Sequence, residues 1–192
     1  MWPPPPPEPV GGLQARSRLK PLLQVRIRKL VVEGMDVELT AKQNVSWMQR
    51  ALELAHQSVV AGNHPFGALL VLNGKVVLEA ENTVNTDSDV TRHAEMNAIS
   101  QACRLMSESD RDQSVLFTST EPCAMCAGAL YWAGIKTVVY GCSAKRLGEI
   151  VGASLQCHSR DVFNGAVNSP EVYGPLLGAD AAAQHEAYWP HL

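Results

Sequence analysis

The sequence predicts a three-layer α/β/α domain built on a mixed five-stranded sheet. Two features favour this fold class. The dipeptide Asn73-Gly74 separates two short segments rich in β-branched and aliphatic residues, which predicts an antiparallel hairpin. Farther along, a buried strand, a helix and a second apolar strand succeed one another over residues 115–141, and this order implies a right-handed parallel crossover. A sheet that contains both kinds of pairing is mixed.

An amphipathic helix is expected to precede the hairpin. Its apolar side chains recur at three- and four-residue spacing: Val45, Met48, Leu52, Ala55 and Val59. Thr40 and Gln43 have the form of a capping box, and Asn44 is a second candidate for the cap that begins the helix. Gly62 is expected to end it.

The chain after this helix alternates between strand and helix patterns. Asn82 opens a polar loop that extends to residue 92. Strands are predicted over 68–72, 76–80, 115–118, 137–141 and 171–176. The last of these contains a proline and is therefore expected at an edge of the sheet. Helices are predicted over 93–107, 123–133, 144–149, 160–164 and 179–188.

Residues 1–34 are expected to lie outside this domain, which would then span residues 35–192. The chain begins with a proline run, which is extended and forms neither helix nor sheet ladder. Residues 13–32 are rich in arginine and contain no acidic residue. Neither segment shares the periodicity of the domain, and Met35 stands just before the first helical pattern. We interpret residues 1–34 as a disordered Pro/Arg-rich extension.

The composition indicates an ordinary globular protein of the cytoplasm. Hydrophobic residues make up 46% of the 192 residues and charged residues 18%, which is enough for a buried core. No run of about 18 apolar residues is present, so we expect no membrane span. The start lacks the basic and apolar segments of a secretory signal. The five cysteines do not make a disulfide framework, and we expect Cys103, Cys142 and Cys157 to be small buried residues.

Charge is unevenly distributed along the chain. Residues 1–34 hold six basic and two acidic side chains, a net charge of +4, and because the whole chain carries −3, the remainder carries −7. Lys and Arg supply most of the affinity of proteins for a phosphate backbone. The acidic domain therefore argues against a nucleic-acid partner.

Two short motifs contain the residues best suited to chemistry. His93 and Glu95 form a His-x-Glu pair, and Cys123 and Cys126 form a Cys-x-x-Cys pair that follows Pro122. Cysteines three residues apart place both sulfurs on one side of a helical turn. Residues two apart point to different sides of a regular helix, so His93 and Glu95 converge only if His93 lies at the start of its helix. The motifs therefore predict two helix N-termini directed at one metal ion.

Zinc is the predicted metal, with His93, Cys123 and Cys126 as its ligands. Catalytic zinc takes three protein ligands of this type and leaves a fourth position to water, whose pKa it lowers toward neutrality. Glu95 is the predicted catalytic residue, which accepts a proton from that water and passes it on. The alternative is a structural zinc with another cysteine or a histidine as fourth ligand. Such sites are usually built from paired ligand motifs, and no second Cys-x-x-Cys is present, so we favour catalysis.

Longer motifs surround these residues: Pro-Phe-Gly-Ala at 65–68, Asn82, Thr-x-His-Ala-Glu at 91–95 and Glu-Pro-Cys-x-Met-Cys-x-Gly-Ala at 121–129. With them, the chain from about Asn44 to Gly141 resembles the cytidine deaminase-like superfamily. It is most similar to the branch that holds guanine deaminases and tRNA adenosine deaminases. The resemblance implies a zinc-dependent hydrolase that replaces an exocyclic amine of a nucleobase or nucleoside with oxygen and releases ammonia.

The same resemblance implies a set of substrate-binding residues. Asn82 would hydrogen-bond the base or sugar, Phe66 would contact the base from the pocket wall, and Ala94 would also line the site. The Tyr-Trp pair that ends at Trp132 is similar to that of small guanine deaminases, in which the indole stacks on the base. Trp132 lies on the helix that begins at the cysteines, so we expect it within reach of the base.

We therefore predict a free purine of guanine type as the substrate and a homodimer as the assembly. One alternative is adenosine-to-inosine deamination of tRNA, against which the acidic domain argues. Another is a deaminase of cytosine or cytidine. An alternative of a different class is an inactive binding protein with this fold, against which the intact His93, Glu95, Cys123 and Cys126 argue.

Overall fold

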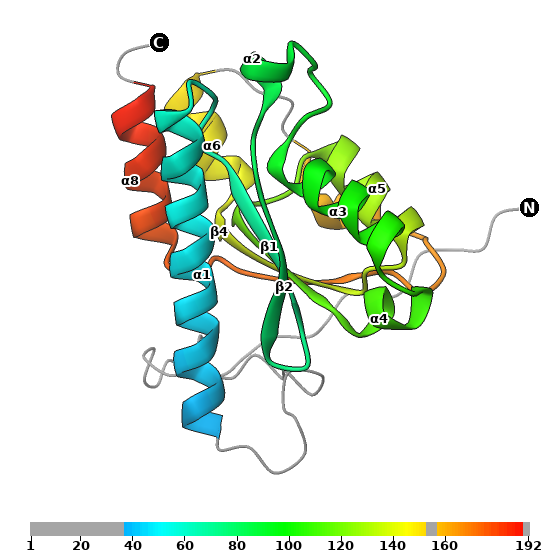
Figure 1. The fold of residues 1–192 in the computed structure, drawn as a ribbon. Coiled ribbons are helices and arrows are strands. Elements are labelled where there is room, and N and C mark those ends of the chain that lie inside the picture. Colours follow the sequence, from blue (N-terminus) through cyan, green and yellow to red (C-terminus); the bar gives the residue numbers. More distant parts are fainter. Residues whose placement is uncertain (1–36, 153–156, 190–192) are drawn as a thin grey trace, which may run out of the picture.

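A mixed five-stranded sheet lies at the centre of the computed structural model (Figure 1). The structure describes residues 37–152 and 157–189. Its strands are β1 (Gly67–Leu72), β2 (Lys75–Glu81), β3 (Val115–Thr120), β4 (Thr137–Cys142) and β5 (Glu171–Tyr173), in the spatial order β2-β1-β3-β4-β5. β1 pairs antiparallel with β2 and β3, whereas β4 pairs parallel with β3 and β5. The predicted hairpin, crossover and edge position of the last strand are confirmed.

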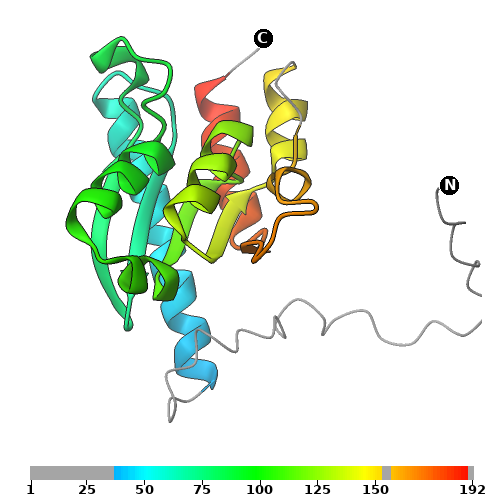
Figure 2. The same ribbon diagram turned by 90° about the vertical axis from the view of Figure 1, so that its right-hand side faces the viewer.

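Helices cover both faces of the sheet. α1 (Val37–Val60) and α8 (Gly178–Tyr188) lie on one face, and α3 (Ala94–Leu105) and α5 (Ala124–Ala133) lie on the other (Figures 1 and 2). Four shorter helices complete the described chain: α2 (Val84–Asp87), α4 (Glu108–Gln113), α6 (Ala144–Val151) and α7 (Ser159–Val162). The arrangement is the predicted three-layer α/β/α fold.

The sheet is buried on both faces, because successive side chains of a strand point to opposite sides. Leu69 and Phe117 pack toward Met48 of α1, while Leu70 and Leu116 pack toward α3 and α5. Each fully buried side chain of this size contributes about 1.5–3 kcal/mol relative to an exposed one. The two cores pack against both faces of β1 and β3. β3 is followed within three residues by Cys123.

Two features of the helices differ from the sequence prediction. α1 begins at Val37, so Thr40 and Asn44 lie inside the helix and do not cap it. Good helix formers occupy most of residues 37–43, so the helix continues through the capping pattern. The prediction also lacks α2, within the polar loop, and α4. Ser107 caps α4 by accepting a hydrogen bond from the backbone N–H of Asp110.

Other sequence predictions meet the structure only in part. The extension over residues 1–34 lies outside the described residues, so the domain boundary at residue 35 stays a prediction. Cys142 is buried as expected and Cys157 is half-buried, but Cys103 is exposed because α3 turns that position toward solvent. Within the described ranges, no helix is long and apolar enough to cross a membrane.

Candidate active site

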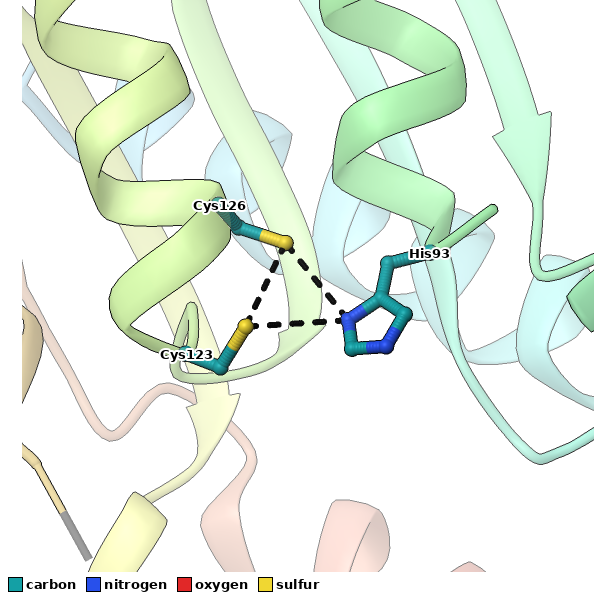
Figure 3. Close-up of side chains that lie close together, drawn as sticks. All are labelled: His93, Cys123 and Cys126. Carbon is teal, nitrogen blue, oxygen red and sulfur yellow. Dashed lines mark hydrogen bonds between the residues drawn. The ribbon is translucent and has the colours of Figure 1, made fainter. Parts of the chain in front are cut away.

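The predicted metal ligands meet where the first turns of α3 and α5 face each other (Figure 3). His93 is the N-cap residue of α3, and Cys123 is the N-cap residue of α5. Both have an extended backbone, which is why His93 can point to the same side as Glu95. Cys126 lies in the first turn of α5 and directs its sulfur back toward the start of the helix. Pro122 lies one position before the cap, outside the helix.

The three ligand atoms form a triangle of the size that zinc requires. The Cys123 and Cys126 sulfurs are 3.6 Å apart, and the Nδ1 atom of His93 lies 3.7 Å from the first and 3.6 Å from the second. In a tetrahedral site with Zn–S distances of about 2.3 Å and Zn–N distances of about 2.0–2.1 Å, sulfurs lie about 3.8 Å apart and S···N distances are about 3.6 Å. The residues therefore fit zinc without rearrangement.

The same three groups share protons with one another. The Cys123 and Cys126 sulfurs lie within hydrogen-bond distance, and this contact is the largest reason that the pKa of Cys123 is lowered to about 4. The hydrogen bond, together with burial, raises the pKa of Cys126. A hydrogen bond with Cys123 raises the pKa of His93 above its ordinary value. A bound cation would replace these shared protons, because it binds the deprotonated ligands.

Glu95 lies beside the triangle, at the start of α3. Its side chain is 4% exposed, and its Oε2 lies 3.8 Å from the sulfur of Cys126. The hydroxyl of Thr118 lies 3.0 Å from Glu95 Oε1 and 3.1 Å from the carbonyl oxygen of Thr120, to either of which it can donate. Burial raises the pKa of Glu95. A carboxyl group whose pKa is raised is a better proton acceptor than an ordinary glutamate, and it can return the proton that it accepts.

A fourth protein ligand is lacking among the described residues. They contain one group of His, Cys, Asp or Glu side chains able to hold a metal ion, and its members are His93, Cys123 and Cys126. Cys142 and Cys157 lie near backbone carbonyls of their own neighbours instead. Three ligands with an open fourth position are typical of catalytic zinc, whereas structural zinc has four.

Three of the predicted substrate-binding residues lie next to His93. The Phe66 ring is parallel to the His93 ring, with 6.4 Å between centroids. The Phe66 carbonyl accepts a hydrogen bond of 3.0 Å from the Asn82 backbone N–H, which fixes the two residues together. Asn82 Oδ1 accepts a hydrogen bond from the Val84 N–H at 3.1 Å, whereas its buried Nδ2 has no partner within the described chain. Ala94 is fully buried directly after His93.

Trp132 does not belong to this group. It is 85% exposed on α5, and its ring contacts that of Tyr131. Six residues along a helix amount to a rotation of about 600° and an advance of about 9 Å, so Trp132 and Cys126 point in different directions. The expectation that Trp132 reaches a base held by its own chain is therefore wrong.

Three side chains near the site are absent from the sequence prediction. Thr118 lies in a strand whose sequence predicts burial, so the sequence does not mark it as a site residue. A polar residue in a buried strand is nevertheless a weak signal of a role near a site. His64 stands two residues before Phe66, and its ring lies 5.4 Å from that of Trp189. His185, on α8, lies 5.2 Å from the Phe66 ring between centroids. Nothing in the local sequence marks His185, because its position results from tertiary packing.

A comparison with protein families identifies this arrangement. The family model described as the cytidine and deoxycytidylate deaminase zinc-binding region matches residues 41–142, more than half of the chain. The chain belongs to this family. The matched region contains His93, Glu95, Cys123 and Cys126. This deaminase is therefore a zinc-binding hydrolase that acts on C–N bonds of cyclic amidines.

The relatives of this deaminase are named for different substrates. A probable cytosine deaminase of Schizosaccharomyces pombe is 35% identical over 160 residues, which cover 80% of this chain and 96% of that protein. The guanine deaminase of Bacillus subtilis is 45% identical over 96 residues, 50% of this chain and 62% of that protein. A solved structure from studies of A-to-I editing by tRNA:A34 deaminases is 29% identical with a TM-score of 0.60, and the match covers 72% of this chain and 98% of that chain.

Proposed function

We propose that this deaminase hydrolyses the exocyclic amine of a free nucleobase, with guanine as the leading substrate. The observation that carries the proposal is the buried Glu95 beside three metal ligands, with the Phe66 ring parallel to His93. A flat heterocycle suits such an aromatic wall. The unpartnered Nδ2 of Asn82 offers a hydrogen-bond donor to an oxygen or ring nitrogen of the base.

Each group at the site has a distinct role in the proposed reaction. His93, Cys123 and Cys126 would hold a zinc ion, which when bound would act as a Lewis acid and lower the pKa of the attacking water. Glu95 would accept a proton from the water as the water oxygen bonds to the carbon that bears the amine, and would give this proton to a ring nitrogen of the base. It would then take the second proton from the new hydroxyl group and give it to the amine, so that the C–N bond breaks and ammonia leaves. Thr118 keeps the carboxyl group oriented through its hydroxyl.

The charge of the domain favours a small substrate over tRNA. Residues 35–192 carry a net charge of −7, and protein affinity for a phosphate backbone comes mainly from Lys and Arg. A free base carries no phosphate and needs no such counter-charge. We therefore expect a KM that changes little with salt concentration, because few counterions are released on binding.

Guanine is the first candidate among the bases, and cytosine is the second. The 45% identity to the B. subtilis guanine deaminase over 96 residues supports guanine. The S. pombe probable cytosine deaminase supports cytosine, since its match covers 80% of this chain and so extends beyond the 41–142 region. Both bases present an exocyclic amine next to a ring nitrogen, which is the group that the proposed mechanism requires.

Ammonia release from a substrate panel tests the proposal. The zinc-loaded protein is incubated with guanine, cytosine, adenine, their nucleosides and a folded tRNA anticodon arm, at low and high salt. We expect turnover of guanine, weak dependence on salt, and ammonia release at least about a hundredfold slower from the Glu95→Gln protein, which controls for contaminating deaminases. Activity confined to the tRNA arm and suppressed by salt would reject the free-base assignment, whereas turnover of cytosine alone would select the second candidate.

We further propose that the protein is a homodimer that uses the outer face of α5. Met125, Gly128 and Trp132 share this face at helical spacing, and α5 contains no charged residue. Met125 and Trp132 are exposed, and a Cβ added to Gly128 would meet no atom within 4 Å. A helix that is apolar on all sides is normally covered, and a second copy of the same apolar face would cover it.

Sedimentation of wild type and two matched variants tests the dimer. Trp132→Glu introduces a charge on the outer face of α5, and Val60→Glu does the same at an exposed valine of α1. We expect the wild type and the Val60→Glu protein to sediment as dimers and the Trp132→Glu protein to shift toward monomer. A monomeric wild type, or equal behaviour of the two variants, contradicts the proposal.

A further inference from the structure

The C-terminal helix places a buried histidine against the wall of the site. His185 lies on α8, is 1% exposed, and belongs to a part of the chain beyond the 41–142 family match. Its ring centroid is 5.2 Å from that of Phe66, with the planes tilted by 46°. Aromatic pairs at this separation attract each other beyond simple burial. Phe66 is therefore held from behind by a residue of another layer of the fold.

Phe66 connects His185 to the metal site. The Phe66 ring also lies 6.4 Å from the His93 ring and nearly parallel to it, at 8°. The three rings form a row that leads from α8 through Phe66 to a metal ligand. Loss of the His185 ring removes this contact with Phe66, the surface on which the base is proposed to lie.

The edge of the His185 ring is anchored to the strand that leads to Cys123. Its Nε2 atom lies 2.7 Å from the hydroxyl oxygen of Thr120, the last residue of β3. Thr120 is 2% exposed, so this hydrogen bond is shielded from water. A phenylalanine at position 185 could pack on Phe66 but could not bond Thr120, and a glutamine could bond Thr120 but could not stack. Histidine is the side chain that does both.

Buried polar atoms without partners gather around the same wall. Among the described residues, His185 Nδ1, Trp189 Nε1 and Asn82 Nδ2 are buried and have no hydrogen-bond partner within the chain. The His185 ring contacts the Phe66 ring, and the Asn82 backbone N–H donates to the Phe66 carbonyl. The Trp189 ring contacts the His64 ring. More than about 90% of buried polar groups in proteins are hydrogen-bonded. Their concentration here indicates a wall that meets a polar ligand or its water molecules.

We propose that His185 is a positioning residue for the base, which acts by holding Phe66 in place. This inference rests on the proposed function, because it assumes a base that lies against Phe66. It assigns a role in substrate binding to α8, which lies outside the region that carries the catalytic motifs. The metal ligands and Glu95 perform the chemistry, while α8 sets the tilt of the surface that receives the ring.

Steady-state kinetics of zinc-loaded variants tests the proposal, with the base that gives the most ammonia as substrate. In His185→Gln the ring is lost, and we expect KM to rise about tenfold, which corresponds to about 1.4 kcal/mol, while kcat and zinc content stay close to wild type. In His185→Phe the ring is retained, and we expect a smaller rise in KM. His56→Gln, a change at an exposed histidine of α1, is the matched control and should leave KM unaltered.

A double-mutant cycle separates positioning from a general structural effect. If His185 acts through Phe66, the double variant Phe66→Leu/His185→Gln should have the KM of Phe66→Leu alone. The reason is that the Phe66 ring, through which His185 acts, is already absent in both proteins. Additive effects on KM contradict the proposal. So does a His185→Gln protein whose melting temperature falls while its KM is unchanged.

The wild-type side chain provides a test that does not depend on whether the variants fold. The imidazole nitrogens of a ¹⁵N-histidine-labelled Glu95→Gln protein are observed by NMR while the base is added, since this protein is expected to bind the base without converting it. We expect the His185 signals to shift as the base saturates the site. Unchanged His185 signals at saturation would overturn the inference. A wild type that releases no ammonia from any free base would instead reject the proposed function.

Discussion

Acidification below about pH 6.5 is expected to destabilise this deaminase through His185. Burial lowers the pKa of His185 from 6.5 to about 4, because the ring is enclosed between α8, Phe66 and Thr120. In the unfolded chain the imidazole is in water and keeps its ordinary pKa. Between these two pKa values the unfolded chain binds a proton that the folded chain does not, so the free energy of unfolding falls as the pH falls.

The size of the effect follows from the two pKa values of His185. Each pKa unit corresponds to about 1.4 kcal/mol, so the full difference amounts to about 3.4 kcal/mol. At about pH 5 the unfolded histidine is nearly all protonated and the folded one nearly all neutral. Roughly 2 kcal/mol of the free energy of unfolding is then lost relative to about pH 7.5.

Urea unfolding of zinc-saturated protein at these two pH values measures the loss. The wild type should lose about 2 kcal/mol more than His185→Gln, because glutamine does not titrate. The metal ligands and carboxyl groups are the same in both proteins, so their contributions cancel in the comparison. His56→Gln replaces an exposed histidine and should retain the wild-type loss. Equal losses in the wild type and His185→Gln would refute the reasoning that His185 is kept neutral by burial.

Four further predictions concern the site and the domain boundary. Glu95→Gln should retain one zinc ion per chain by mass spectrometry while kcat falls by a factor of about 10²–10⁴ or more, since an amide cannot transfer the proton; near-normal kcat refutes the role. Cys123→Ala should lose zinc and melt at a lower temperature, because binding energy of the metal is folding energy. Thr118→Val should keep zinc and lower kcat about 10- to 100-fold, as expected for one hydrogen bond to a charged group; unchanged kcat contradicts the assigned orientation of Glu95. A chain that begins at Met35 should be soluble and have the kcat/KM of the full chain. An insoluble or inactive product would show that part of residues 1–34 belongs to the domain.

The parts of the site that the sequence predicts are those fixed by short-range geometry. Three-residue spacing places Cys123 and Cys126 on one helical turn wherever that turn lies. The two-residue spacing of His93 and Glu95 makes sense only at a helix start, and the structure has His93 at the N-cap. The fold class was equally accessible, because the Asn-Gly hairpin and the strand-helix-strand order each allow few topologies.

The parts that the sequence does not predict depend on direction or on distant packing. Trp132 is on the expected helix, but its side chain is exposed on the outer side. The number of residues between Cys126 and Trp132 does not by itself show the direction of a side chain around the helix axis. His185 meets Thr120 across 65 positions of sequence, and no local pattern encodes such a contact. The start of α1 was misplaced for a similar reason: a capping pattern marks a helix end only if the preceding residues leave the helix, and here they do not.

The last residues of β3 join the catalytic groups to the helix that borders the substrate wall. Thr118 and Thr120 are two residues apart at the end of β3, and their hydroxyl groups contact residues of α3 and α8 respectively. The first bonds Glu95, the second bonds His185, and the chain then reaches Cys123 within three residues. The hydrogen bond to Thr120 therefore fixes α8 against the strand that leads to the metal ligands. With its position fixed in this way, the His185 ring lies against Phe66, and this second contact is the one through which we propose that α8 influences the binding of the base.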